Sequence, residues 1–309
     1  MEFIRGLHNI RDPHRGCVLT IGKFDGVHLG HEAVIGQLLA KSQELQLPSV
    51  VMLFEPQPEE LFTPDKAPAR LSRLRDKYHR LQQLGVDRLL CLNFTPMFAA
   101  QSAEYFVQHL LVEQLGIAFL VVGDDFRFGK GRKGDFEYLQ QAGKQHNFEV
   151  INTASLCLNQ ARVSSSAIRE LLVQDQLQEA AAMLGRPFSI SGKVVHGAKK
   201  GRTIGFPTAN LLLKRHRSPV QGVYAVTVHI GEQQFLGVAN VGNRPTVDGE
   251  KPQLEVHIFD FDQHLYGQFI EVDLHHKIRQ ERKFASFEEL KLQIQRDAKQ
   301  AREWLQNNR

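Results

Sequence analysis

The hydrophobic and polar positions divide the chain into two halves with different rhythms. In the first half, short apolar runs alternate with segments whose apolar residues recur every three or four positions. The runs predict strands over 17–21, 49–54, 86–92, 117–122 and 148–151, and the periodic segments predict helices over 29–45, 72–84, 103–115 and 136–146. This alternation predicts a parallel sheet with helices on both faces, a Rossmann-like α/β domain. Helical patterns over 165–173 and 177–184 close this half.

The rhythm changes after Gly185-Arg186-Pro187. Short strand patterns follow over 188–195, 222–230, 234–241, 253–259 and 269–277, separated by Gly, Asn and Asp. Several short strands with turn signals predict a small antiparallel β-barrel. A pattern of period 3.6 predicts a last helix over 287–305, capped by Ser286. We therefore predict two domains, residues 1–184 and residues 185–309.

Length and cysteine content fit this division. A chain of 309 residues is typical of two domains. The three cysteines are far apart and form no CxxC pair, which favours a reduced, cytoplasmic protein without disulfides or a zinc site. The first residues have no apolar signal-peptide core, and no apolar run reaches the roughly 20 residues that span a bilayer. The sequence thus predicts no membrane partner.

The net charge of +4 is mild, but it is unevenly distributed. Residues 186–231 contain eight Lys or Arg and no Asp or Glu. Such a stretch is either a solvated basic face or a site for a polyanion, which could be nucleic acid or the phosphates of a nucleotide.

The stretch GKFDGVHLGH, residues 22–31, lies where the first strand meets the first helix. Glycines allow the backbone to approach a ligand, and a helix N-terminus favours phosphate. His28 and His31 share a helix face and can both donate to phosphate oxygens. A metal site would need a third ligand, which the neighbouring sequence lacks, and a structural role for both histidines is the other alternative. Phosphate binding is therefore predicted here, and its loop residues are Gly22, Phe24, Asp25 and Gly26.

The HxGH pattern after a first strand resembles the nucleotidyltransferase superfamily, in which it holds the phosphates of ATP. The superfamily's second motif, SSTxxR, is matched near the end of the half by Ser164-Ser165-Ser166-Ala167-Ile168-Arg169. Ser164 would supply hydroxyl and N–H donors, and Arg169 a fixed cation for departing pyrophosphate. Taken alone, this segment would be a serine-capped helix.

A further loop, GDDFRFGKGRKG, follows the fourth strand at residues 123–134. It contains a GxGxxG match, but the glycines do not directly follow the strand, so a dinucleotide fingerprint is only weakly indicated. Asp124, Phe126 and Phe128 instead favour a platform for a flat ring. An ordinary loop with buried phenylalanines is the alternative.

The second half holds a glycine-rich basic segment, residues 192–211, that lacks the spacing of a Walker A loop. We expect it to wrap nucleotide phosphates through Gly197, Lys199, Gly201, Arg202 and Gly205. Thr208 and Asn210 then present oxygens two residues apart, as on a strand, and hard oxygen ligands suit Mg²⁺. Glu255 lies in an apolar strand pattern, where a carboxylate is either structurally paired or poised as a base.

Three runs in this half, GRTIGFPTAN, GVANVGNRPT and EVHIFDF ending in LYG, are similar to riboflavin kinases. With the first half, residues 15–297 resemble the prokaryotic bifunctional riboflavin kinase/FAD synthetase family. The resemblance implies that riboflavin and ATP give FMN in the barrel, and that FMN and ATP give FAD and pyrophosphate in the first domain. It also implies Mg²⁺ at both sites and Glu255 as the base for the ribityl hydroxyl. Thr208 and Asn210 would be the Mg-nucleotide ligands, and Asp124, Phe126 and Phe128 would line the flavin side.

Two positions depart from the family pattern, which often has His where Gln57 stands and Thr where Ser166 stands. Ser166 keeps the hydroxyl, whereas Gln57 cannot carry a positive charge. Two alternatives stay open: an adenylyltransferase with a degenerate kinase half, and a nucleic-acid-binding protein that uses the basic stretch. The presence of GFPTAN and Glu255 argues against the first. The glycines among the cations favour nucleotide phosphates over nucleic acid.

Overall fold

The computed structural model describes residues 1–158, 160–196, 205–213, 217–246 and 249–308. Internal contacts divide the chain into two compact units. The first comprises Met1–Pro68 and Ser72–Ser165, and the second comprises Ala69–Leu71 and Ser166–Arg309. Each unit has its own sheet and its own core.

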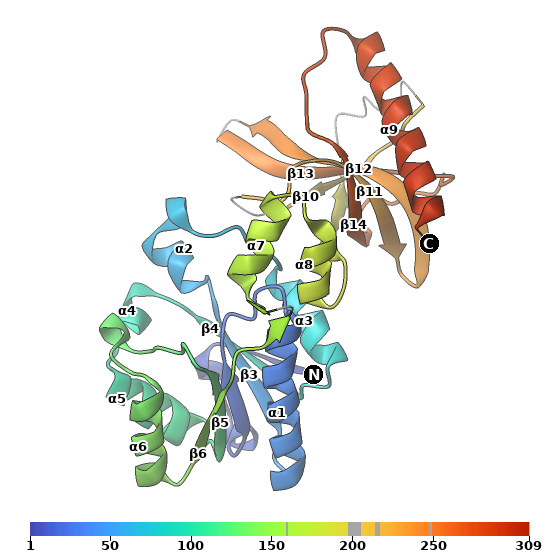
Figure 1. The fold of residues 1–309 in the computed structure, drawn as a ribbon. Helices are drawn as coiled ribbons and strands as arrows, with labels where there is room; N and C mark the ends of the chain where they lie inside the picture. Colours follow the sequence, from blue (N-terminus) through green and yellow to red (C-terminus); the bar gives the residue numbers. More distant parts are fainter. Residues whose placement is uncertain (159, 197–204, 214–216, 247–248, 309) are drawn as a thin grey trace. The chain divides into compact units, whose positions relative to one another are not determined.

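A six-stranded parallel sheet forms the centre of the first unit, in the order β1-β4-β3-β2-β5-β6 (Figure 1). All neighbouring strands pair in parallel. The strands are β1 (Glu2–Arg5), β2 (Val18–Ile21), β3 (Ser49–Glu55), β4 (Arg88–Asn93), β5 (Phe119–Gly123) and β6 (Glu149–Thr153). A separate two-stranded hairpin joins β7 (Cys157–Leu158) to β8 (Ala161–Arg162).

Helices bury both faces of this sheet, because successive strand residues point to opposite sides. Val18 packs with α1 (Leu29–Leu45) and α3 (Leu74–Gln83), whereas Leu19 packs with residues 106–115 and α6 (Phe136–His146). Figure 1 shows α1 and α6 on opposite sides of the sheet. The predicted α/β architecture is confirmed.

The structure differs from the sequence prediction at β1 and at residues 103–115. In β1 only Ile4 is buried, so the strand carries too little pattern to be recognised. The segment predicted as one α-helix is α5 (Ala103–Tyr105) followed by a π-helix, η4 (Phe106–Gln114). The wider helix places Phe106, Leu110 and Leu111 together in the core, and the carbonyl of Leu110 accepts from the N–H of Leu115.

Shorter elements connect the sheet. They are η1 (Leu7–Asn9), η2 (Asp12–His14), α2 (Pro58–Phe62), η3 (Pro64–Lys66), α4 (Pro96–Ala99) and η5 (Lys130–Arg132). Of these, α2 and α4 follow β3 and β4, so both lie at the carboxyl end of the sheet.

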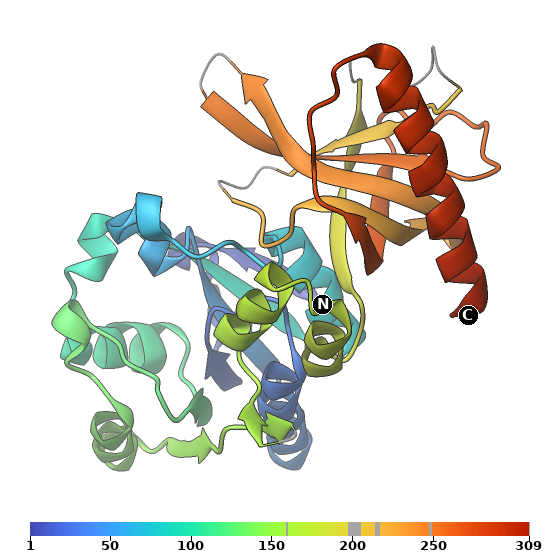
Figure 2. The ribbon, with the colours of Figure 1, turned by 45° about the horizontal axis from the view of Figure 1, so that its top comes forward.

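The second unit is built on a closed antiparallel barrel in the order β10-β13-β12-β11-β14-β9 (Figure 2). Its strands are β9 (Phe188–Val195), β10 (Ala209–Leu212), β11 (Gly222–Ile230), β12 (Gln233–Thr246), β13 (Gly249–Ile258) and β14 (Phe269–Arg279). The predicted barrel is confirmed, and β10 closes it by pairing with both β9 and β13. Closure pairs every barrel strand with a neighbour on each side over part of its length.

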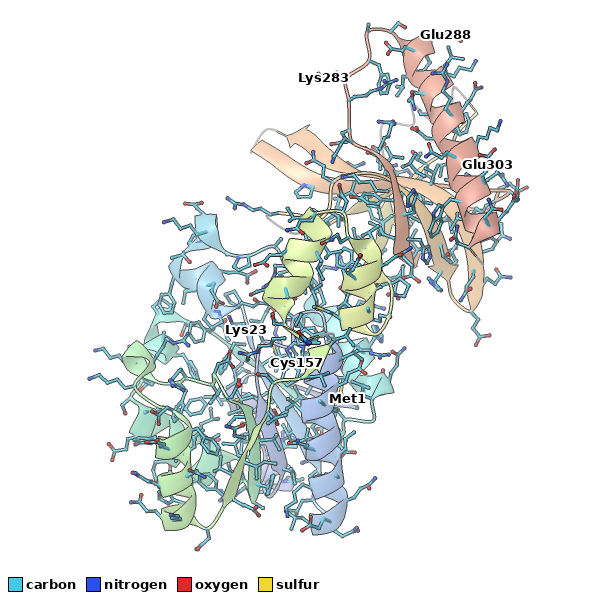
Figure 3. The ribbon with its side chains drawn as sticks, in the orientation of Figure 1. Met1, Lys23, Cys157, Lys283, Glu288 and Glu303 are labelled. Atoms are coloured by element: carbon cyan, nitrogen blue, oxygen red, sulfur yellow. The ribbon has the colours of Figure 1, made fainter. Side chains whose placement is uncertain are left out.

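The long helix α9 (Phe287–Asn307) packs along the barrel and begins at the predicted cap, where the Ser286 hydroxyl accepts from the Glu289 N–H. Ala298, Ala301 and Leu305 of α9 are buried against the barrel. Figure 3 labels Glu288 and Glu303 towards its two ends and Lys283 on the connection from β14. A bidentate pair between Arg279 and Asp297, with the nearest atoms 2.7 Å apart, ties the helix to β14.

By contacts, α7 (Ser165–Val173) and α8 (Leu177–Leu184) lie almost wholly in the second unit. The helix α8 packs on β9 and β14, and Lys277 pairs with Asp175 at 2.7 Å. The contact division therefore falls after Ser165. The sequence places the functional boundary after residue 184, and that boundary stays a prediction.

Candidate active sites

The first candidate site lies at the carboxyl end of the parallel sheet. Chain order runs outward from β2 through β3 to β4 in one direction and continues with β5 and β6 in the other. The topological switch point therefore falls between β2 and β5, where open α/β sheets bind ligands. The loop containing His28 follows β2, and the loop containing Asp124 follows β5. Both predicted loops thus flank the switch point.

His28 and His31 cap the first helix together. The N–H of His31 donates to Nδ1 of His28, and the N–H of His28 donates to Nδ1 of His31, each over 3.3 Å. The two rings stack with centroids 3.6 Å apart. An Nδ1 atom that accepts a hydrogen bond carries no proton, so the proton of each neutral ring lies on Nε2. Each histidine can therefore offer an Nε2–H donor while its Nδ1 holds the helix start.

Gly30 makes this arrangement possible. A Cβ at this position would lie 3.2 Å from the ring of His28 and 3.2 Å from the carbonyl oxygen of Val163. That is tighter than nine in ten real Cβ contacts, so a side chain would push the ring or the backbone before α7 by a few tenths of an ångström. The glycine of HxGH thus allows His28 to lie close to the backbone that precedes α7.

The loop before the histidines has an unusual backbone. Phe24, Gly26 and Val27 have φ values of 47°, 87° and 41°, and Phe24 and Val27 are buried. A β-branched residue at positive φ is strained, and such strain persists only where surrounding contacts impose it. The Nζ of Lys77 donates to the Lys23 carbonyl over 2.8 Å, and the Ser72 hydroxyl accepts from the Gly26 N–H over 2.8 Å.

Asp25 belongs to this support and is 1% exposed. Its carboxylate accepts from the N–H of Ser72 over 3.0 Å, and its carbonyl accepts from the hydroxyl of Ser165 over 2.9 Å. A buried carboxylate with these partners shapes the loop. It would be poorly placed to meet a phosphate directly, because like charges repel. For Gly22 the observed contact is also structural, since its N–H donates to the Met52 carbonyl.

The residues that match the SSTxxR motif divide between the two units. Ser164 is half-buried in the first unit, directly before α7. Its neighbour Ser165 makes the contact with the loop, which sequence reasoning missed. Arg169 lies on α7 in the second unit, where its Nε donates to the Ala69 carbonyl over 2.6 Å. The proposed chemical roles of Ser164 and Arg169 stay predictions.

The loop after β5 is partly structural. Phe128 is 7% exposed and packs against Phe106 and Tyr138 in the core, so its ring supports the loop from within. Phe126 stacks on Phe128 and is half-buried. Asp124 is exposed and is held by Arg162 at 3.0 Å and by the Ser155 hydroxyl at 2.7 Å. Of the two phenylalanines, Phe126 is therefore the one whose ring is accessible to a ligand.

An aromatic cluster at the carboxyl ends of β3 and β4 was not predicted. Its members are Phe54, Phe62, Phe94 and Phe98, with neighbouring ring centroids 5.6–5.9 Å apart. Phe62 is 62% exposed, which is unusual for a phenylalanine with aromatic neighbours. The sequence FEPQPEELF contained part of the signal, because it has a phenylalanine at each end of a proline-bounded loop. Both rings contact Phe94, which lies outside this segment.

Gln57 lies in the same loop and precedes α2. It is 6% exposed, and its backbone N–H donates to Glu60 over 2.9 Å. Among the residues that the structure describes, its Nε2 has no hydrogen-bond partner. A buried amide donor without a partner is costly. Gln57, which departs from the family pattern, therefore has an unused donor in the loop between Phe54 and Phe62.

The second candidate site lies on the outer face of the barrel. In the strand register, Glu255 of β13 pairs with Asn210 of β10 and with Asn240 of β12. Asn240 in turn pairs with Val223, and Val223 with Arg279. Register partners of antiparallel strands share a face. The five side chains thus form a row across the barrel, with Glu255 exposed and Asn210 buried.

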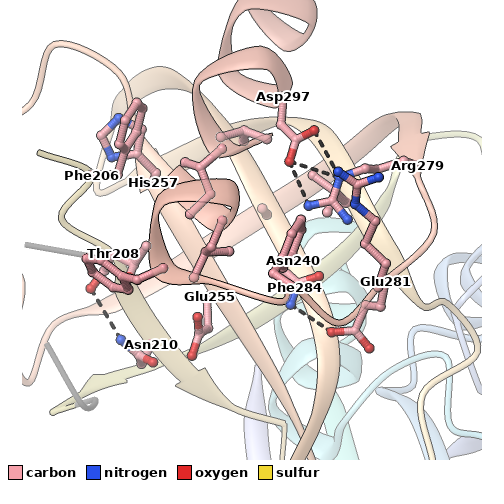
Figure 4. Close-up of a pocket in the computed structure, with 17 residues that line it drawn as sticks. Phe206, Thr208, Asn210, Asn240, Glu255, His257, Arg279, Glu281, Phe284 and Asp297 are labelled. Atoms are coloured by element: carbon pink, nitrogen blue, oxygen red, sulfur yellow. Dashed lines mark hydrogen bonds and ion pairs between the residues drawn. The ribbon is translucent and has the colours of Figure 1, made fainter. Parts of the chain in front are cut away.

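This row lines a pocket of about 360 Å³ between the barrel, the 280–286 connection and the start of α9. Figure 4 shows Thr208, Asn210 and Glu255 at one end of the pocket and Arg279 with Asp297 at the other. Its apolar lining includes Phe206, Val223, Val238, Phe284, Phe287 and Leu290. A mostly apolar pocket with a few convergent polar groups is typical of a site for a small organic molecule.

The segment that carries Thr208 and Asn210 is held in place by β13. Nδ1 of His257 donates to the carbonyl of Pro207 over 2.9 Å, and Nδ2 of Asn210 donates to the carbonyl of Thr208 over 3.3 Å. Burial lowers the pKa of His257, so the ring stays neutral at physiological pH. The two predicted oxygen donors are therefore brought beside Glu255.

Oxygen donors of this kind fit Mg²⁺ but do not enclose it. The described residues contain no group of three or more His, Cys, Asp or Glu that could hold a metal. Magnesium is commonly bound by one or two protein oxygens together with substrate phosphates and water. The hydroxyl of Thr208 and the amide oxygen of Asn210 would suffice in that role. Of the predicted phosphate loop, Gly205 is exposed with φ 82°, whereas Gly197, Lys199, Gly201 and Arg202 lie outside the described residues.

Comparison with known proteins defines the class of protein. Residues 10–167 match the FAD synthetase family, and residues 184–305 match the riboflavin kinase family. The chain therefore combines a nucleotidyltransferase half with a kinase half, in the order that the two folds suggest. It belongs to the family of bifunctional riboflavin kinases/FMN adenylyltransferases, because relatives of that description match it over nearly its whole length.

The relative from Escherichia coli K12 is 55% identical over 306 residues, which cover 98% of both chains. The relative from Haemophilus influenzae is 52% identical over 303 residues and also covers 98% of both chains. A crystal structure described as a macrolide-efflux protein from Streptococcus pneumoniae is similar with a TM-score of 0.80 at 32% identity, over 96% of this chain and 97% of that one. Among the described helices of this chain, none is long and apolar enough to cross a membrane.

Proposed function

We propose that this chain phosphorylates riboflavin to FMN at the barrel site and adenylylates FMN to FAD at the sheet site, with ATP as co-substrate in both reactions. The observation that carries this proposal is the full-length match to a family whose relatives are described by both activities. Each half also has a built site: the capped histidine pair at a sheet switch point, and Glu255 beside an apolar pocket.

In the kinase reaction, the terminal ribityl hydroxyl attacks the γ-phosphorus of ATP. An O–P bond forms, the bond to the departing ADP breaks, and the hydroxyl proton passes to the carboxylate of Glu255. Glu255 suits this role because it is exposed on the outer face of the barrel and lines the pocket. A general base contributes about 10²–10⁴-fold.

Magnesium would neutralise charge on the transferring phosphoryl group when bound. Thr208 and Asn210 would hold it together with the nucleotide. The flavin ring would occupy the apolar part of the pocket, between Phe206 and the first turn of α9, and its ribityl chain would extend towards Glu255. The basic segment with Gly197, Lys199, Gly201, Arg202 and Gly205 would bind the phosphates of ATP.

In the adenylyl transfer, a phosphate oxygen of FMN attacks the α-phosphorus of ATP and pyrophosphate leaves. The attacking phosphate is already ionised, so the site needs no base. His28 and His31 would donate from Nε2 to the phosphates of ATP, and Ser164 and Arg169 would stabilise the leaving pyrophosphate. Because both Nδ1 atoms accept backbone N–H groups, the histidines would act as neutral donors fixed in direction.

The flavin of FMN would lie against the aromatic cluster after β3 and β4. Phe62 offers an exposed ring, and Phe126 offers the remaining surface after β5. The buried ring of Phe128 would support Phe126 from the core, and Arg162 would hold Asp124 in place. These assignments extend the flavin site predicted from the loop 123–134.

We retain the functional boundary after residue 184, in line with the start of the riboflavin kinase match at residue 184. The helices α7 and α8 would then belong to the adenylyltransferase by function while packing with the barrel. A cytoplasmic location follows from the substrates proposed, since ATP and flavins are supplied there. It would be tested by fractionating cells of the source organism and measuring both activities in each fraction.

The proposed function is tested by incubating purified protein with riboflavin, ATP and Mg²⁺ and separating the flavins over time. FMN should appear first and FAD later. FMN that accumulates without FAD would contradict the adenylyl site, and no conversion of either riboflavin or supplied FMN would contradict both. Addition of EDTA should stop both steps, which tests the magnesium requirement.

A further inference from the structure

Gln253 is a buried glutamine on β13, two residues before Glu255, and is 5% exposed. Its Nε2 donates to two acceptors, Oε1 of Glu255 over 2.8 Å and Oδ1 of Asn210. The side chain therefore joins the proposed base to a proposed magnesium ligand. The three sequence runs similar to riboflavin kinases do not include this position.

The orientation of this amide follows from its neighbours. Both groups that face Nε2 are oxygens, and the carboxylate of Glu255 accepts only. Reversing the amide would bring three oxygens together and leave no donor between them. Asn210 is fixed in the same way, because its Nδ2 donates to the carbonyl of Thr208.

The amide of Gln253 thus donates one N–H to the proposed base, Glu255, and the other to the proposed magnesium ligand, Asn210. The network runs from Glu255 through Gln253 to Asn210 and on to Thr208. The carbonyl oxygen of Asn210 has two lone pairs, so accepting from Gln253 leaves one for a metal ion. Hydrogen bonds of this kind orient metal ligands and bases without touching the substrate.

We propose that Gln253 is the positioning residue of the kinase site: it sets the carboxylate of Glu255 and the amide oxygen of Asn210 in one fixed relation, so that base and magnesium-nucleotide are aligned by a single side chain. This rests on the roles of Glu255 and Asn210 under the proposed function. Gln253 itself is buried and does not contact substrate.

The proposal predicts a dual kinetic effect. Loss of the bond to Glu255 removes a hydrogen bond that orients the base and lowers kcat. Loss of the bond to Asn210 releases the magnesium ligand and raises KM for Mg-ATP. A residue that merely filled the core would change neither once the protein had folded.

The test is Gln253→Met, which keeps the length of the side chain and removes both donors. Kinase activity should fall about 10–100-fold, the usual cost of removing such a partner, with kcat lowered and KM for Mg-ATP raised. Conversion of supplied FMN to FAD by the same molecules should stay unchanged, which controls for enzyme concentration and for the first unit. Gln234→Met, at an exposed position on β12, is the matched control and should behave as wild type.

Unchanged kcat and KM in Gln253→Met would overturn the proposal, and so would an equal loss in Gln234→Met. Folding of the barrel is checked by fluorescence of Trp304, the one tryptophan of the chain. If Gln253→Met unfolds the barrel, Gln253→Asn decides, because it keeps an amide too short to reach both acceptors. Wild-type kinetics in that variant would again contradict the role.

A double-mutant comparison separates this proposal from the proposed function. In an Asn210→Ala background, Gln253→Met should raise KM for Mg-ATP much less than it does alone, because the two changes break the same link. Additive effects would overturn the positioning role. If Glu255→Ala kept kinase activity, the proposed base itself would be wrong. An inactive Glu255→Ala enzyme beside a fully active Gln253→Met enzyme would overturn only the role of Gln253.

Discussion

The two candidate sites position their phosphate-handling residues in different ways. The sheet site is built on a loop, where backbone conformation does the positioning: Phe24 and Val27 adopt positive φ, and His28 and His31 bind each other's backbone. The barrel site is built on strands, where side chains in register place Glu255 beside Asn210. An ionised phosphate nucleophile needs donors and alignment, whereas a hydroxyl nucleophile also needs a base. The architecture of each site matches the nucleophile proposed for it.

The largest expected effect comes from removing the base. Glu255→Ala should lower FMN formation by about 10²–10⁴-fold, because the hydroxyl loses its proton acceptor. FAD formation from supplied FMN should stay at the wild-type rate, measured by chromatography on the same preparation. Equal loss of both activities in a folded variant would contradict the assignment of two separate sites.

The reverse experiment is His28→Ala. The adenylyl transfer should fall by about 10²–10³-fold through loss of a donor to the phosphates, and riboflavin kinase activity should stay unchanged. The substitution also removes a helix cap, at a cost of about 1 kcal/mol in the free energy of unfolding.

His28→Asn separates the two losses. Asparagine is among the best capping residues, so it should restore the melting temperature, but it is too short to supply the donor that Nε2 offers. Stability should therefore return without activity. Return of full adenylyl transfer would show that His28 acts only as a cap.

The two sites also differ in how much of each could be predicted from the sequence. Most of the long elements, the barrel and the pairing of His28 with His31 followed from period, spacing and position, whereas the short strands β1 and β10 did not. Phe128 was predicted to line a ligand, yet its spacing from Phe126 also suits a core residue, and the structure buries it. Pairwise contacts between distant segments, such as Ser165 with Asp25, have no local pattern.

The place of Gln253 beside Glu255 could have been predicted from the sequence. Alternation along a strand places residues 253, 255 and 257 on one face, so a polar residue two positions before the proposed base lies beside it. What the sequence could not supply was the register of β10 against β13, which brings Asn210 to the same point. A short strand with one polar position does not reveal which neighbour it pairs with.

A third change tests how far the barrel site depends on the helix that covers it. Asp297 is 3% exposed and accepts three hydrogen bonds from Arg279, so Asp297→Ala leaves a guanidinium partly buried without its counterion. We expect a loss of about 3 kcal/mol in the free energy of unfolding of the barrel. Denaturant unfolding followed by Trp304 fluorescence measures it, since Trp304 stacks on His276 within this unit. Kinase activity should fall, because Arg279 and Asp297 line the pocket and the change disrupts that side of it. Adenylyl transfer should persist. An unchanged transition midpoint would show that the ion pair is dispensable.

The smallest expected effect is a dependence of barrel stability on pH. Burial lowers the pKa of His257, His275 and His276. In the unfolded chain these rings take up protons near their ordinary pKa of about 6.5, whereas the folded barrel resists protonation. The unfolded state therefore binds more protons as pH falls, and stability should be full above about pH 6.5 and decline below it. The melting temperature by Trp304 fluorescence should drop by several degrees between pH 7.5 and 5.5.

The variant His276→Phe should show a smaller drop in melting temperature, because it keeps the stacking contact with Trp304 and removes one titrating ring. A melting temperature that is constant or rises towards pH 5.5 would contradict this account, and would place the pH sensitivity of the chain outside the barrel's histidines.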